Sequence, residues 1–193
     1  MNLTSYSANA YTYDAYLNLS QQATSTETSP VVYDPKYHKY IENCNHIIED
    51  VSRFLMLDKK LFNLSSKLKN RALWVITEPW CGDAAQILPV LYAIEMASAG
   101  MCELSLFLRD QNEGLMNLFL TEGSQSIPIV ILVDSDHNVI KHWGPRSKPA
   151  AEYASKLKTD SLPLDEFIAK LSQWYAEDKT KSFQEEMCEF LKS

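Results

Sequence analysis

Apolar residues follow two patterns along the chain, and the first predicts a sheet. Short runs that are apolar throughout and rich in β-branched residues are typical of strands buried on both faces. Strands are predicted at residues 72–76, 102–108, 129–133 and 139–143, although Glu103 and Ser105 interrupt the second run and Lys141 and His142 the fourth. The last two flank Asp134–Asn138, whose Asp and Asn residues favour a turn, so these two runs should form a hairpin.

The second pattern places apolar residues three and four positions apart, which predicts helices. It is clearest from Pro35 to about Leu57, and it recurs at Leu61–Leu68, Gly114–Leu120 and Pro163–Lys192. The first part of the last segment should cover the sheet, and Ser155–Leu162 is predicted to be a polar break before it. Within the 114–120 helix three side chains should point inward: Leu115, Leu118 and Phe119.

The chain is predicted to have four parts: an N-terminal segment 1–30, a helical extension 31–69, a main domain 70–178 and a C-terminal helix or tail 179–193. The N-terminal segment contains a low-complexity run, Gln21–Ser29, which predicts a flexible linker. Its tyrosines suit either packing on the domain's own surface, through Tyr13, Tyr16 and Leu17, or docking to a partner. The tail helix could pack on the N-terminal extension or on another subunit.

The strongest candidate for chemistry lies where the first strand meets the following helix. The strand stops at Thr77–Pro79, and an apolar stripe of helical spacing begins just after Cys81: Ala84, Ala85, Leu88, Leu91 and Ile94. A cysteine at a helix N-terminus is favoured as a thiolate by the unpaired N–H groups and the helix dipole. The alternative is that Cys81 is a small apolar residue packed under Trp80.

The motif Trp80-Cys81-Gly82 resembles the start of the active-site motif of the thioredoxin superfamily. Pro89 falls where thioredoxins carry the proline that bends their active-site helix, Ile127-Pro128 resembles the family's cis-proline, and Gly144 matches a family glycine near the same site. The resemblance covers roughly residues 70 to 178. It implies an α/β, thioredoxin-like fold with a central mixed sheet of about four strands flanked by helices, to which this chain adds helices at both ends.

The motif departs from the family at two positions, because it reads WCGDA in place of WCGPC. Ala84 replaces the resolving cysteine, so a dithiol cycle cannot run within this motif. Asp83 replaces the proline, and its negative charge should offset part of the dipole's effect on the Cys81 thiol. Val75 stands where thioredoxins carry a buried acid that helps to move the second thiol's proton.

The resemblance also implies a surface that binds substrate. The backbone of Ile127, before Pro128, would face Cys81 and pair with an extended peptide through main-chain hydrogen bonds. The neighbouring residues Trp80, Gly82 and Asp83 would complete this surface. Accessory residues are Glu78, Arg109, His142 and Arg146. Arg146, and after it Arg109, could hold an anionic ligand such as glutathione, and His142 could assist the thiol only if strand alternation turns it that way.

Three functions therefore remain open for Cys81. A monothiol enzyme would attack a disulfide, and glutathione as co-substrate would release the mixed disulfide. A sensor would let peroxide oxidise Cys81 to a sulfenic acid. A redox-inactive binding module would keep only the groove beside Pro128 and bind an extended peptide or protein partner. The first hypothesis is favoured, and whether the protein is an enzyme stays open.

Composition narrows the partners and the setting. The 193-residue chain has a net charge of −7 and a pI near 5.1, which disfavours nucleic acid and anionic membrane surfaces. The N-terminus lacks the pattern of an export signal, so we expect a cytoplasmic protein with reduced cysteines. Those cysteines are Cys44, Cys81, Cys102 and Cys188. No Cys/His spacing resembles a metal site, Cys102 should begin its strand at the end far from Cys81, and the oligomeric state is open.

Overall fold

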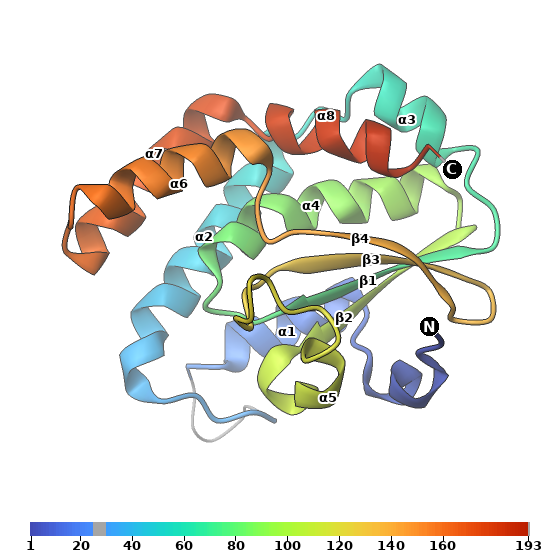
Figure 1. The fold of residues 1–193 in the computed structure, drawn as a ribbon, viewed down its shortest axis with the longest axis horizontal. Coiled ribbons are helices and arrows are strands. Elements are labelled where there is room, and N and C mark those ends of the chain that lie inside the picture. Colours follow the sequence, from blue (N-terminus) through green and yellow to red (C-terminus); the bar gives the residue numbers. More distant parts are fainter. Residues whose placement is uncertain (25–29, 193) are drawn as a thin grey trace.

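The computed structural model describes residues 1–24 and 30–192, and its centre is one mixed sheet with helices on both sides (Figure 1). In spatial order the strands are β2 (Cys102–Leu108), β1 (Arg71–Thr77), β3 (Ile129–Asp134) and β4 (Val139–Trp143). β1 runs parallel to β2 and antiparallel to β3, which in turn pairs antiparallel with β4. The α/β fold class and the mixed sheet of four strands that the sequence predicted are confirmed.

β1 and the helix after it position the candidate cysteine. β1 lies between two other strands and is covered on both faces, so Leu73, Val75 and Ile76 are fully buried. α4 (Gly82–Ala97) starts directly after Cys81, contains Pro89, and has most of its residues buried, six of them in the main core. Cys81 is therefore held between the end of β1 and the first turn of α4, as the apolar pattern predicted.

The N-terminal residues pack onto the domain itself. Tyr13 and Tyr16 of α1 (Tyr13–Gln22) are buried in the main core, and this confirms the first of the two predicted uses of the tyrosines. Just before α1, the backbone of Tyr11 exchanges two 2.8 Å hydrogen bonds with Leu106 on the edge strand β2. Residues 21–22 of the predicted linker belong to α1, and its residues 25–29 lie outside the described part of the chain.

The helical extension before the sheet has the elements that the sequence predicted. It contains α2 (His38–Phe54) and α3 (Lys59–Ser65). A short 3-10 helix, Pro35–Tyr37, precedes α2. Two others lie outside the extension, at Thr4–Asn9 and Arg109–Gln111. Cys44 is buried on α2 against Ile48 and against Ala85 of α4, in agreement with its predicted place in the core.

The predicted helix 114–120 is mostly wrong. α5 covers only Glu113–Met116, and the chain continues in tight turns in which the N–H groups of Leu118 and Phe119 bond three residues back. Leu115 and Phe119 are buried as expected, but Leu118 is 46% exposed. Apolar residues three and four positions apart fit a short helix followed by tight turns as well as one longer helix, so the pattern could not separate the two.

The polar break predicted at Ser155–Leu162 is also wrong. α6 (Lys148–Thr159) runs through most of it and packs on α7 (Leu164–Asp178). The buried stripe of α6 consists of Ala150, Ala154 and Leu157, two of which have small side chains. A stripe built largely from alanine gives little contrast in hydropathy, which explains why the apolar pattern did not predict this helix.

The C-terminal segment packs differently from the prediction. Left-handed residues Lys179 and Thr180 separate α7 from α8 (Lys181–Phe190). The tail helix α8, rather than α7, supplies side chains to the main core: Phe183, Met187, Cys188 and Phe190. α7 instead forms a second, smaller core with α6, so the expectation that the first part of 163–192 covers the sheet is corrected.

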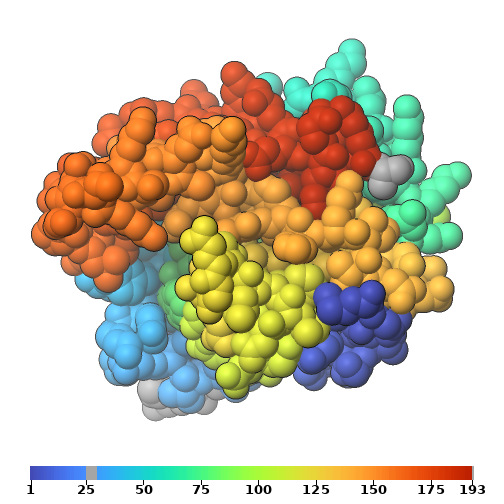
Figure 2. Space-filling view, in the orientation of Figure 1, coloured from blue at the N-terminus to red at the C-terminus, as the bar shows by residue number. Residues whose placement is uncertain are grey.

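A carboxylate fixes α8 to the sheet. Glu186 accepts a 2.6 Å hydrogen bond from the Trp143 indole at the end of β4 and a 2.7 Å bond from the Lys148 backbone N–H at the start of α6. The beginning of the chain meets the same hairpin, because Leu3 N–H donates to the His137 carbonyl at 2.9 Å. In Figure 2 the N-terminal segment accordingly lies against the β3–β4 hairpin.

Candidate functional site

Cys81 is buried at the junction of β1 and α4, as the sequence predicted, and lies opposite the Ile127–Pro128 bond. The Cys81 side chain is only 7% exposed, and its S–H group donates to the Ile127 carbonyl oxygen at 3.6 Å between sulfur and oxygen. The Cys81 backbone joins the loop to the helix, because its N–H bonds to the Glu78 carbonyl at 2.9 Å and its carbonyl accepts from Ala85 at 3.0 Å. The two predicted parts of the site, Cys81 and the backbone before Pro128, are therefore in contact.

Gly144 supports the other side of this site. The Ile127–Pro128 peptide bond is cis, and Gly144 packs against it with φ at +132°, a conformation that L side chains rarely adopt. A Cβ atom at Gly144 would lie 2.3 Å from the Pro128 carbonyl oxygen, well inside van der Waals contact. Only glycine fits here without a shift of the Pro128 backbone.

The Cys81 thiol is protonated at neutral pH. Burial raises its pKa well above the usual cysteine range, and the nearby Asp83 carboxylate raises it further. The Ala84 N–H and the Arg146 guanidinium lower the pKa of Cys81, but they act more weakly than burial. The helix N-terminus does not produce the thiolate that the sequence pattern favoured, because the sulfur is shielded from water.

Asp83 is the centre of a partly buried polar network. It accepts a bidentate pair of hydrogen bonds from Arg146, the Nε contact being 2.8 Å, and a 2.7 Å bond from the Tyr175 hydroxyl on α7. The side chains of Arg146 and Asp83 are only 22% and 10% exposed. Arg146, expected to hold an anionic ligand, is thus paired within the chain, and Tyr175 is a site residue that the apolar pattern of its helix did not reveal.

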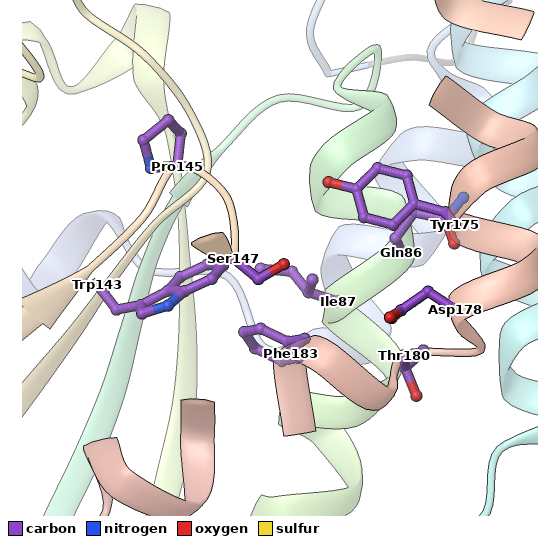
Figure 3. Close-up of a pocket in the computed structure, with 9 residues that line it drawn as sticks. All are labelled: Gln86, Ile87, Trp143, Pro145, Ser147, Tyr175, Asp178, Thr180 and Phe183. Atoms are coloured by element: carbon purple, nitrogen blue, oxygen red, sulfur yellow. The ribbon is translucent and has the colours of Figure 1, made fainter. Parts of the chain in front are cut away.

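Tyr175 lies between two cavities of unequal size. The smaller one measures about 10 Å³ and is lined by Tyr175, Gln86, Ser147 and Thr180 among others (Figure 3). A volume of this order holds at most one water molecule. The larger one, about 110 Å³, lies between α2, α7 and the start of α4, beside Gly82 and Asp83. Only the larger cavity has room for part of a ligand.

Arg109 supports Trp80. Its guanidinium lies 4.9 Å from the centre of the Trp80 ring, and its Nε is 2.8 Å from an Asp110 carboxylate oxygen. Tyr37 also stacks on Trp80, with ring centres 5.2 Å apart. Within the described residues the Trp80 indole nitrogen is buried without a hydrogen-bond partner. The second predicted anion-binding cation therefore contributes to holding this tryptophan in place.

Glu78 is buried behind the site. It is 1% exposed and accepts hydrogen bonds from the Tyr33 hydroxyl at 2.8 Å and from the Asp110 backbone N–H at 2.9 Å. Burial raises the pKa of its carboxyl, although both hydrogen bonds act in the opposite direction. Glu78 thus ties the loop before Cys81 to the helical extension and to the turn after β2.

His142 is not brought to the thiol. It pairs with Ile131 in the sheet register, its side chain is exposed, and its ring lies 5.3 Å from that of Phe119. Strand alternation therefore turns it away from Cys81. Cys102 pairs with Arg71 at the far end of β1 and Cys188 lies on α8, so neither of these two cysteines replaces the missing resolving thiol of the motif.

The raised pKa of Glu78 leads to a prediction on pH. Since the folded-state pKa lies above the unfolded-state value of about 4.3, the unfolded chain releases this proton first, and the native state loses stability as the pH rises through the interval between the two values. Glu78→Gln keeps an uncharged side chain there. The free energy of unfolding of Glu78→Gln, measured by urea unfolding, should therefore increase relative to that of the parent protein as the pH rises from 4 to 7.

The matched control for this prediction is Glu42→Gln, at an exposed position on α2. Its stability should follow the parent curve at every pH, because the Glu42 carboxylate remains in water in both states. If the Glu78→Gln and parent curves also run parallel, Glu78 titrates alike in the folded and unfolded states and the argument from burial is wrong.

Within the described residues no group of three or more His, Cys, Asp or Glu side chains could hold a metal ion. Nor does any helix in residues 1–24 and 30–192 have the length and apolarity needed to cross a membrane.

A mixed sheet of this topology, with a cysteine at the β1–α4 junction facing a cis-proline, defines a thioredoxin-like protein. The chain belongs to the thioredoxin family, whose model matches residues 32–158. The match includes α2 and α3, which the sequence suggested to be an extension before the family domain.

Solved structures agree on the fold. A crystal structure of a protein of unknown function from Pseudomonas aeruginosa is 12% identical, with a TM-score of 0.56 over 91% of this chain and 96% of that one. An HIV epitope-scaffold is 14% identical, with a TM-score of 0.58 over 93% of this chain and 92% of that one. No curated protein matches. At such low identity these likenesses extend to the fold alone.

Proposed function

We propose that this protein is a thioredoxin-family binding module that holds an extended peptide segment of a partner beside Cys81 and Pro128, with Cys81 as a neutral thiol. The observation that carries the proposal is the state of the sulfur. It is buried, its S–H donates a hydrogen bond to the Ile127 carbonyl, and its pKa is raised. A nucleophilic cysteine needs an accessible thiolate, and this site provides the opposite on both counts.

The motif and the adjoining backbone support the same proposal. With Ala84 in place of a second cysteine, a mixed disulfide formed at Cys81 could not be resolved within the motif. Next to the sulfur, the Ile127 N–H donates no hydrogen bond to any described residue. An unpaired backbone N–H can donate a hydrogen bond to an extended strand of a partner, which gains affinity from the main chain.

A monothiol enzyme is the second candidate, favoured by one specific contact. The Ala84 backbone N–H is directed at the Cys81 sulfur and lowers its pKa, so a thiolate would find one hydrogen bond ready. Cys81 would then attack a disulfide and expel one thiolate, and the glutathione thiolate would attack the mixed disulfide and return Cys81 to its starting state. This cycle requires the site to open first.

Alkylation of Cys81 by iodoacetamide against pH separates the two candidates. We expect almost no reaction between pH 6 and 8 in the folded protein, and a midpoint above the free-cysteine value of about 8.5, because burial and Asp83 both disfavour the thiolate. The measurement is peptide mass spectrometry of the Cys81 peptide after short exposure to the reagent. Cys81→Ser defines the background from the other three cysteines.

Two results would overturn this proposal in favour of thiol chemistry. One is a midpoint below 8.5, which would mean an activated thiolate. The other is glutathione-dependent reduction of hydroxyethyl disulfide that disappears in Cys81→Ser. Since a peroxide sensor needs the same accessible thiolate, an unreactive Cys81 excludes that role together with the enzyme.

A further inference from the structure

The larger of the two cavities next to Tyr175 has walls suited to an apolar group. It holds about 110 Å³ and lies between α2, the first turn of α4, and α7. Six of its lining side chains are aromatic or aliphatic: Tyr40, Trp80, Phe167, Ile168, Leu171 and Tyr175. Apolar walls with a few polar groups are typical of sites that bind a ligand's apolar part.

The cavity lies between the contacts that α7 makes near its two ends. Near the start of α7, the Asp165 carboxylate binds Lys39 at 3.0 Å and the Tyr40 hydroxyl at 3.1 Å, both on α2. Near its end, Tyr175 binds Asp83. Between these two attachments α7 packs on α6 rather than on the main core, which leaves the space open.

The two charged groups at the cavity wall, Asp83 and Arg146, already pair with each other. Asp83 receives the bidentate pair from Arg146 and the hydroxyl of Tyr175, so one negative and one positive charge cancel at the cavity wall. A charged occupant would have to be stripped of water and break this pair, and such burial costs free energy unless a new partner repays it. The charge of the site therefore selects an uncharged, apolar occupant over an anion such as glutathione.

The cavity opens next to the thiol. Trp80 and Gly82, the two neighbours of Cys81, both line it. Gly82 is exposed, and no atom lies within 4 Å of the position where its Cβ would be. A peptide lying along Cys81 and Ile127 could thus pass Gly82 freely, and an extended peptide turns alternate side chains to opposite sides.

We propose that this cavity receives one apolar side chain, aromatic or branched, of the peptide bound beside Cys81. The inference rests on the proposed binding function and adds its selectivity. Affinity comes from the Ile127 backbone, which reads no sequence, whereas the cavity between α2 and α7 reads one side chain. Burial of a single side chain of this size changes the dissociation constant by at least about tenfold.

The test uses peptides selected from a random dodecapeptide library displayed on phage, binding to the full chain. We expect the enriched peptides to share one aromatic or branched residue at a fixed position. Ser172→Trp places a large side chain in the cavity from α7 and should weaken a selected peptide at least about tenfold. The same peptide with alanine at the shared position should bind both proteins equally weakly.

The matched control is Gln173→Trp, which adds the same side chain one position along α7, at an exposed residue that does not line the cavity. It should bind like the parent protein. Ser172→Leu, a smaller filling, is measured alongside, and circular dichroism together with thermal melting checks that each variant is folded.

The outcomes separate the two proposals. If peptides are enriched and Ser126→Trp, beside Ile127, abolishes their binding while folded Ser172→Trp and Ser172→Leu leave it unchanged, the groove is real and the cavity assignment is wrong. If no peptide is enriched, both proposals fail. In that case free p-cresol is added to the parent protein. If p-cresol perturbs the Trp80 indole NMR signal and Ser172→Trp removes the effect, the cavity is a site for a small molecule and the peptide assignment is overturned.

Discussion

Gly144→Ala should be the most destabilising single substitution near the site, with a loss of roughly 3 kcal/mol or more in the free energy of unfolding. Two independent penalties act together. The backbone φ of +132° is one that alanine rarely adopts, and the new Cβ would lie 2.3 Å from the Pro128 carbonyl oxygen. The atom in the way belongs to the backbone of a buried segment, so it cannot move aside as a flexible side chain would.

Urea unfolding followed by tryptophan fluorescence measures this loss, and Gly82→Ala is the control. Gly82 has no atom within 4 Å of its Cβ position and begins α4 with helical backbone, so alanine there should change stability by less than about 1 kcal/mol. Equal shifts in the two variants would mean that the segment around Pro128 can adjust, and the argument from close packing at Gly144 would be wrong.

Arg146→Met should also destabilise the protein strongly, by about 2 to 3 kcal/mol. Methionine keeps most of the length and apolar surface of arginine but removes the positive charge. The Asp83 carboxylate, 10% exposed, would remain without its bidentate partner and with only the Tyr175 hydroxyl. The loss is placed slightly below that of a fully buried pair because the Arg146 side chain is 22% exposed.

A double-mutant cycle tests whether the loss comes from the stranded charge. Asp83→Asn removes the negative charge and can still accept from Tyr175, so the variant carrying both substitutions should be more stable than Arg146→Met alone. The exposed Lys39–Asp165 pair is the comparison, and Asp165→Asn should cause no measurable change. If Arg146→Met unfolds at the parent's urea concentration, the pair contributes nothing to stability.

The main elements of the fold could be predicted because their signals are local. The strand β1 and the helix α4 have unbroken or regularly spaced apolar residues, and Trp80-Cys81-Gly82 marks the junction between them. α6 lacked such a signal because alanines form much of its buried stripe. α7 and α8 both have an apolar face, and their sequences do not indicate which of the two helices packs against the sheet.

The chemical state of the site could not be predicted, since it depends on distant partners. Arg146 and Asp83 are 63 positions apart, and Tyr175 and Asp83 are 92 apart. Nothing near the motif therefore indicates that its aspartate pairs with an arginine and a tyrosine. The helix N-terminus argued for a thiolate at Cys81. Burial by residues from several elements outweighs that local effect, and burial is visible only once the chain is folded.

The place of α8 affects how the protein can be made. A ribosome synthesises Trp143 well before Glu186, the residue that will accept its indole hydrogen bond 43 positions later. Until α8 has emerged, the main core lacks Phe183, Met187 and Phe190, and apolar surface stays in contact with water. Folding before α8 has emerged therefore stops short of the native state, and during that interval the nascent chain is exposed to aggregation or chaperone binding.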